Sequence, residues 1–140
     1  MPENPATPLT RKLGIKPEAR VALLAAPAGF QRLLDPLPGG VSLSTGLHGT
    51  EPFDVVVAFA LLRAEVADAV SSARPLMTPA AGLWIAWPKR SSKVPTEVTE
   101  DLVREIALPT GLVDNKVCAI DATWTGLRLV IRRELRPRVT

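Results

Sequence analysis

The stretch Gly82-Leu-Trp-Ile-Ala-Trp-Pro-Lys89 decides the fold that this sequence predicts. It is apolar and uncharged up to Lys89, which is typical of a central strand buried on both faces of a parallel sheet. A segment with helical periodicity precedes it and another follows it, so it belongs to an alternation of strands and helices. Lys89, Arg90 and Lys93 then come where an open α/β sheet normally holds a ligand.

The hydrophobic pattern on either side of this stretch predicts the remaining elements. Strands are expected at 20–26, 41–45, 53–60, 116–121 and 127–134. Helices are expected at 28–34 and 62–77, and from Thr96, the expected N-cap, to Pro109. The fold class is therefore α/β, a single Rossmann-like and mostly parallel sheet with helices on both faces and a C-terminal antiparallel hairpin.

One domain is expected for the whole chain. With 140 residues, of which 46% are hydrophobic, the chain is long enough to bury one core. Residues 1–10 hold three prolines and little apolar surface, so we expect a flexible N-terminal arm before a single α/β domain over 11–140. A short helical turn should end at Gly14, with Leu13 and Ile15 packed on the domain.

Composition argues against several classes of protein. The net charge is only +3, and aromatic residues make up 4% of the chain, so a base-stacking surface has little to build on. The single cysteine excludes an internal disulfide. The N-terminus does not resemble a signal peptide, and the longest uncharged apolar run, 55–62, is too short to cross a bilayer. We expect a cytoplasmic protein without a membrane partner.

Four stretches of the chain resemble a known bacterial family. They are Leu13-Gly14-Ile15, Gly82 to Lys89, Gly111 to Ile120 and Trp124-Thr-Gly-Leu-Arg128, and they look like the domain-of-unknown-function 3052 family. This resemblance covers nearly the whole chain and implies no assigned activity. The helix that leads into a closing antiparallel hairpin also resembles the C-terminal half of class I methyltransferases, which implies a fold but not a function.

The turns where a methyltransferase binds its cofactor depart from that resemblance. The turn Ala25-Ala-Pro-Ala-Gly29 has one glycine, and Pro27 supplies no N–H. The next strand ends in Ser44-Thr45-Gly46, without the carboxylate that would hold ribose hydroxyls. We therefore expect no cofactor. We interpret the protein as a non-catalytic binding or interaction module on a methyltransferase-like fold that lacks the cofactor-binding glycine loop.

Six residues make up the candidate ligand site, namely Lys89, Asp114, Asn115, Lys116, Trp124 and Arg128. A pocket around Lys89, Asn115 and Arg128 would bind a small anionic ligand, either in a binding protein or in an enzyme. The alternatives are structural. The basic loop could be solvated surface, Asp114 and Asn115 could form a turn, and Trp124 could fold back on the core or meet a partner.

The C-terminal segment carries the one strong cluster of charge, formed by Arg128, Arg132, Arg133, Arg136 and Arg138. Such a cluster could bind nucleic acid weakly through phosphate contacts. The interpretation that we favour is an exposed edge strand whose arginines prevent edge-to-edge aggregation. A homo-oligomer formed through this strand or through the apolar N-terminal segment stays open.

No pattern in the sequence predicts catalysis or a metal site. Cys118 and His48 are the one pair suited to nucleophilic catalysis, but nothing in the sequence brings them together. Cys118 lies between Val117 and Ala119, which is typical of a cysteine packed as a small hydrophobe. Neither residue has a second ligand at the spacing that zinc requires.

Overall fold

Six strands form one sheet in the structure, a computed structural model that describes residues 7–136. The strands are β1 (Arg20–Leu24), β2 (Ser42–Ser44), β3 (Phe53–Phe59), β4 (Met77–Pro88), β5 (Leu112–Ala119) and β6 (Trp124–Ile131). The α-helices are α1 (Leu9–Leu13), α2 (Arg63–Ala73) and α3 (Glu100–Ala107). Short 3₁₀ helices are η1 (Phe30–Leu34), η2 (Arg74–Leu76), η3 (Arg90–Ser92), η4 (Leu108–Thr110) and η5 (Arg133–Leu135).

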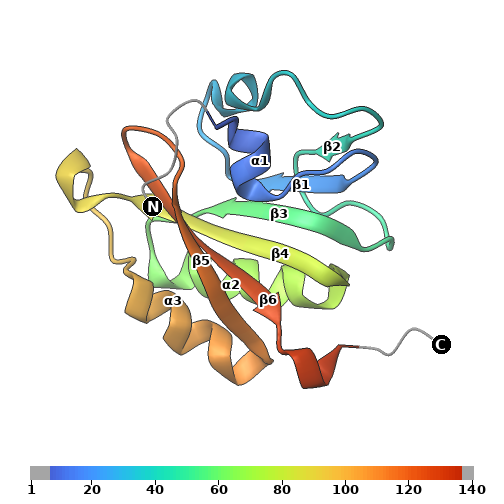
Figure 1. The fold of residues 1–140 in the computed structure, drawn as a ribbon. Coiled ribbons are helices and arrows are strands. Elements are labelled where there is room, and N and C mark those ends of the chain that lie inside the picture. The colour runs from blue at the N-terminus through green and yellow to red at the C-terminus, as the bar shows by residue number, and fades with distance from the viewer. Residues whose placement is uncertain (1–6, 137–140) are drawn as a thin grey trace.

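The strands follow one another across the sheet in the order β2-β1-β3-β4-β6-β5. The first four strands, β2, β1, β3 and β4, run parallel to one another, whereas β6 runs antiparallel to both β4 and β5. Figure 1 shows β6 lying between β4 and β5 as the closing hairpin of the sheet. The predicted α/β class, with a mostly parallel sheet and a C-terminal antiparallel hairpin, is confirmed.

Helices cover both faces of the sheet, as predicted (Figure 1). On one face, α2 and α3 contribute Val66, Val70 and Val103 to a buried cluster. On the other face, Leu13 of α1 and Phe30 of η1 belong to a second buried cluster. The expected packing of the N-terminal helical turn is confirmed, because Gly14 ends α1 in a left-handed conformation at φ 79° and Ile15 is buried.

The strand β4 supplies side chains to both clusters in strict alternation. Leu83 and Ile85 face α2 and α3, whereas Trp84 faces α1. The Trp84 indole is fully buried, and its Nε1–H donates a hydrogen bond to the Leu13 carbonyl oxygen at 3.0 Å. This bond satisfies a carbonyl at the end of α1, so the central strand holds the N-terminal helix in place.

The start of β4 differs from the sequence-based expectation. A helix was expected over 62–77, but α2 ends at Ala73 and β4 already begins at Met77. The pairing with β3 is irregular here, because Phe53 pairs with Met77 while Val55 pairs with Gly82. Proline is tolerated within strands at such irregular places, which explains how Pro79 lies inside β4.

The N-terminus of α3 also differs from its prediction. Thr99, not Thr96, is the N-cap, and its hydroxyl accepts a hydrogen bond from the Leu102 N–H at 3.1 Å. Thr96 instead donates to the Leu61 carbonyl oxygen at 2.8 Å. Glu97 accepts from the Arg63 N–H at 2.8 Å, so its carboxylate stabilises the start of α2.

The interpretation of the C-terminal arginines as protection for an edge strand is wrong. Arg128 lies in β6, which has a hydrogen-bonded neighbour on each side, so the edge strand is β5. Arg132 and Arg133 follow the end of β6, and Arg138 lies outside the described residues. Of the expected N-terminal arm, residues 1–6 lie outside the described part of the chain and α1 begins at Leu9, so the arm stays a prediction.

Replacement of Trp84 by phenylalanine should destabilise the protein more than the same replacement at Trp87. Trp84→Phe leaves the Leu13 carbonyl oxygen buried without a donor, which costs about 1–3 kcal/mol beyond the lost contact area. Trp87 is 6% exposed and its indole forms no hydrogen bond with any residue of the described chain, so Trp87→Phe is a matched control. Urea unfolding of both variants measures the difference, and equal losses of stability would contradict this role of Trp84.

Candidate functional site

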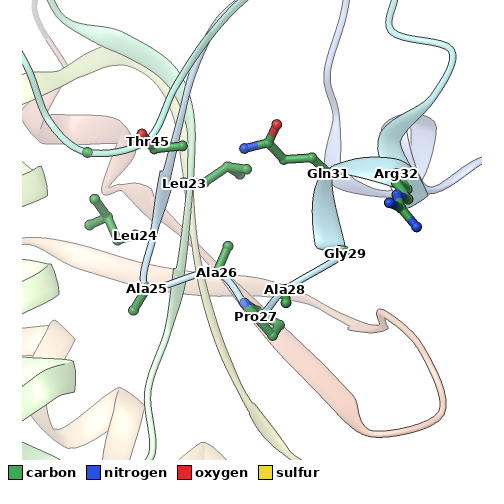
Figure 2. Close-up of a pocket in the computed structure, with 11 residues that line it drawn as sticks. Leu23, Leu24, Ala25, Ala26, Pro27, Ala28, Gly29, Gln31, Arg32 and Thr45 are labelled. Carbon is green, nitrogen blue, oxygen red and sulfur yellow. The ribbon is translucent and has the colours of Figure 1, made fainter.

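The strand order places a crevice at the carboxyl ends of β1 and β3. From β1 the chain continues to β2, on one side of β1, whereas from β3 it continues to β4, on the other side of the sheet. The connections therefore diverge between β1 and β3. A cavity of about 600 Å³, which we name the β1 cavity, opens there (Figure 2). It is lined by Leu23, Leu24, Ala25, Ala26, Pro27, Ala28, Gly29, Gln31, Arg32, Thr45 and Gly46.

The turn after β1 forms the floor of this cavity and offers few hydrogen-bond donors. Ala25 adopts a left-handed conformation at φ 55°, which is strained for a residue with a Cβ atom. Pro27 has no N–H. The helix that follows, η1, is a 3₁₀ helix of five residues, so no α-helix presents its N-terminus to the cavity.

The polar side chains of the β1 cavity come from η1 and from the end of β2. Figure 2 shows the Gln31 side chain extending from η1 in the direction of Thr45. The Ser44 hydroxyl donates to the Gly46 carbonyl oxygen at 2.5 Å, which fixes the backbone at the end of β2. Arg32 is the one charged residue among those that line the cavity, so no carboxylate faces it.

A second cavity of about 490 Å³, which we name the β3 cavity, lies beside the first between β3 and α2. The two cavities share Leu24 and Ala25. Two carboxylates line it, but Glu65 already accepts hydrogen bonds from the Leu61 and Leu62 N–H groups at 2.9 Å each. Asp68 is exposed on α2. Together the β1 and β3 cavities make up the crevice at the carboxyl end of the sheet.

Lys89 lies farther along the same end of the sheet, after the last residue of β4. It lines a cavity of about 580 Å³, the Lys89 cavity, together with Arg90, Lys93, Thr96 and Glu100. Its backbone N–H donates to the Thr123 carbonyl oxygen at 2.7 Å, which ties the basic loop to the hairpin. Lys93 holds a left-handed conformation at φ 62° at the end of η3.

Arg128 lies toward the opposite end of the sheet from Lys89. Arg128 pairs with Trp84 in the middle of β4, whereas Trp124 pairs with Pro88, the residue before Lys89. The Arg128 side chain lines a separate cavity with Lys16 and Asp54, near the amino ends of β1 and β3. The structure therefore does not bring Lys89 and Arg128 into one pocket.

Asp114, Asn115 and Lys116, the three predicted site residues of β5, line neither the cavity around Lys89 nor the cavity around Arg128. Asp114 accepts a hydrogen bond from Arg104 Nε at 3.1 Å, and this bond raises the pKa of the Arg104 guanidinium above its usual value, against the effect of its desolvation. Asn115 is an exposed extra residue in a β-bulge, because Asp114 pairs with Leu129 and Lys116 with Arg128. The exposed Lys116 ammonium lies 3.4 Å from the Lys12 carbonyl oxygen.

Trp124 folds back on the core of the domain. Its ring packs edge-on against Phe59, with centroids 5.0 Å apart, and Phe59 packs in the same way on Phe30 at 4.8 Å. Such edge-to-face pairs add to the stability that burial of the rings provides. The row of three rings thus joins the hairpin, β3 and η1 beneath the carboxyl end of the sheet.

Other candidate chemistry has little support in the geometry. Cys118 belongs to β5 and His48 follows β2, so the pair lies at opposite edges of the sheet. Within residues 7–136, no three His, Cys, Asp or Glu side chains come together in a way that could hold a metal ion. No helix in the described part of the chain is long and apolar enough to cross a membrane.

Sequence reasoning did not select the polar residues of the crevice. Gln31, Arg32 and Asp68 look like ordinary exposed positions of helices, and their side chains are exposed. The signal that could have found Gln31 and Arg32 is position alone, since both lie in the first turn of the helix after the first strand. In an open α/β sheet this segment borders the ligand site.

Comparison of the fold with solved structures finds methyltransferases. An S-adenosylmethionine-dependent methyltransferase from Aquifex aeolicus matches with a TM-score of 0.65 over 88% of this chain and 88% of its own, at 14% identity. Fibrillarin from Aeropyrum pernix, solved with natively bound S-adenosylmethionine, matches with a TM-score of 0.61 over 87% of this chain and 73% of its own, at 16% identity. The ribosomal protein L11 methylase from Lactobacillus delbrueckii subsp. bulgaricus matches with a TM-score of 0.62 over 89% of this chain and 75% of its own, at 11% identity.

These identities show the fold alone, a methyltransferase-like Rossmann fold. No protein-family model and no curated protein matches the chain. The resemblance to the domain-of-unknown-function 3052 family is therefore not confirmed.

The residues of the β1 cavity do not fit S-adenosylmethionine. The ligand carries a sulfonium and an ammonium, but the charged residue that lines the β1 cavity is Arg32. Rossmann-type sites hold ribose hydroxyls with a carboxylate at the end of the second strand, where this chain has Ser44 and Thr45. The turn after β1 lacks both a glycine-rich backbone and an α-helix N-terminus.

Proposed function

We propose that the protein is a non-catalytic binding module built on a methyltransferase-like sheet. The observation that supports this proposal is the donor set of the β1 cavity, in which one arginine and no carboxylate line the place where a methyltransferase would hold its cofactor. Pro27 removes a further backbone donor from the same turn. Loss of these contacts removes affinity for the methyl donor while the sheet itself stays intact.

The crevice keeps the properties of a ligand-binding cleft. The β1 and β3 cavities adjoin at Leu24 and Ala25, and most of the residues that line them are apolar. Clefts of a few hundred cubic ångströms with mostly apolar walls and few polar groups are typical of small-molecule sites. Gln31, Arg32 and Thr45 are the polar residues that would orient a ligand in the β1 cavity.

S-adenosylmethionine should not raise the melting temperature of the protein. A ligand that binds only the native state stabilises it by an amount that grows with the ratio of ligand concentration to dissociation constant, so a thermal-shift titration reports on binding. The variant Arg32→Gln is the informative comparison, because it removes the positive charge that would repel the sulfonium. We expect no shift in either protein, and a saturable rise in the wild type or in Arg32→Gln would contradict the proposal.

A second candidate function is the binding of a small anion in the Lys89 cavity. Lys89, Arg90 and Lys93 line it, and none of them forms an ion pair with another described residue. The one carboxylate among the lining residues, Glu100, pairs with Arg104 at 3.0 Å. This leaves a surplus of positive charge at the carboxyl end of β4, where open α/β sheets bind ligands.

Inorganic phosphate should raise the melting temperature if the Lys89 cavity binds anions. Lys89→Ala should weaken phosphate binding about tenfold, the effect of losing one hydrogen bond to a charged group. Lys116→Ala removes the same charge from β5, away from the cavity, and should leave binding unchanged. Equal behaviour of the two variants in a titration at constant ionic strength would exclude the site.

Weak nucleic-acid binding, a cytoplasmic location and a homo-oligomer stay predictions from the sequence. The arginines that motivated nucleic-acid binding are divided between β6 and the segment that follows it. No contact among the described residues adds support for a nucleic-acid surface.

A further inference from the structure

Arg128 occupies an unusual place for a charged residue, in the middle of the sheet and directly across from the buried Trp84. The two residues pair in the register of β4 and β6, and each lies beside a glycine of the opposite strand. A Cβ atom on Gly126 would lie 3.1 Å from Trp84 Cε3. A Cβ atom on Gly82 would lie 2.5 Å from Arg128 Nε. Gly126 thus leaves room for the Trp84 ring, and Gly82 leaves room for the Arg128 side chain.

This arrangement sends the Arg128 guanidinium toward the amino end of β4. Gly82 precedes Trp84 in that strand, and the guanidinium carbon would lie 3.0 Å from a Cβ atom on Gly82. The side chain reaches a cavity of about 440 Å³, the Arg128 cavity, which Lys16, Glu18, Asp54 and Thr78 also line.

The Arg128 guanidinium has no acidic partner within residues 7–136. It forms neither a hydrogen bond nor an ion pair there, in contrast to Arg104, which pairs with three carboxylates. Partial burial lowers the pKa of Arg128 below its ordinary value, and the nearby Arg136 guanidinium lowers it further. An arginine without a partner, half-buried and next to a second cation, is stabilised by any anion that reaches it.

The two carboxylates that line the Arg128 cavity form no ion pair with the Arg128 guanidinium. Asp54 accepts hydrogen bonds from the Arg20 N–H at 2.8 Å and from the Thr78 hydroxyl at 3.3 Å. The Glu18 carboxylate packs against Gly40, where an added Cβ atom would lie 2.5 Å from its carbon and from one oxygen. Both still contribute negative charge, which disfavours a ligand of high negative charge more than one of single charge.

We propose that Arg128, laid over Gly82, binds the carboxylate of a small ligand in the cavity that Lys16, Asp54 and Thr78 also line. Two parallel N–H···O bonds from the guanidinium would hold the carboxylate. Asp54 and Glu18 select a singly charged carboxylate over a phosphate. This site lies at the end of the sheet opposite to the crevice, and it does not depend on the function proposed for that crevice.

The test follows the side-chain Nε–Hε resonances of the arginines in the full chain by NMR. Sodium acetate is titrated against sodium chloride at constant ionic strength, and the Arg128 resonance is assigned by its loss in Arg128→Lys. We expect acetate to move this resonance saturably. The resonance of Arg133, an exposed arginine in η5, is the matched control and should not move.

Two variants separate the guanidinium from its charge. Arg128→Lys keeps the charge but loses the paired N–H groups, so acetate affinity, read from backbone amides near Asp54 and Thr78, should fall about tenfold. Gly82→Ala should lower it by a similar factor because the added methyl group displaces the guanidinium. If Gly82→Ala fails to fold, Arg128→Lys alone carries the comparison.

Three results would overturn the proposal. One is an Arg128 resonance that does not move, and another is equal movement of the Arg128 and Arg133 resonances, which would show unspecific attraction of acetate. The third is unchanged acetate affinity in Arg128→Lys. Tighter binding of inorganic phosphate than of acetate would overturn the assignment of the ligand as a carboxylate.

Discussion

Burial of β4 on both faces is the constraint on which the rest of this structure depends. One face of the strand packs on α2 and α3 through Leu83 and Ile85, and the other holds α1 through the hydrogen bond from Trp84 to Leu13. Trp84 packs closely over Gly126 of the neighbouring strand, where an added Cβ atom would lie 3.1 Å from Trp84 Cε3. The same pairing brings Arg128 over Gly82, so one register serves both the core and a charged residue.

An apolar centre of the sheet leaves polar chemistry to its two ends. The carboxyl end holds the crevice around the turn after β1 and, farther along, the basic loop around Lys89. The amino end holds the Arg128 cavity. The methyltransferase-like sheet carries one arginine and no carboxylate in the β1 cavity, and function resides in such sites and not in the fold.

The sequence was sufficient to predict the α/β class because strong local signals agree with one another. Val55, Val56 and Val57 are buried in β3 as expected, and Gly14 ends α1 as expected. Predictions failed where tertiary contacts decide. Thr99 caps α3 because Thr96 and Glu97 bind the start of α2, a contact between segments that are more than thirty residues apart.

The candidate site was harder to predict for the same reason. Lys89 follows β4 and Arg128 lies in β6, the strand that pairs with β4, but the antiparallel register of the pair sends the two residues to different cavities. The strand β6 lies inside the sheet, so its arginines do not protect an edge strand. This position depends on strand pairing, which the sequence pattern does not encode. The sequence allows Trp124 either to fold back on the core or to meet a partner, and the edge-on contact with Phe59 shows that it packs on the core.

We expect that the turn after β1 does not hold the methyl donor. The most direct measurement is a titration of the ¹⁵N-labelled protein with S-adenosylmethionine, followed by the backbone amide resonances of Ala25, Ala26 and Gly29. The account predicts that these resonances stay in place at all ligand concentrations. Saturable movement of these amides, with the rest of the spectrum unchanged, would contradict it.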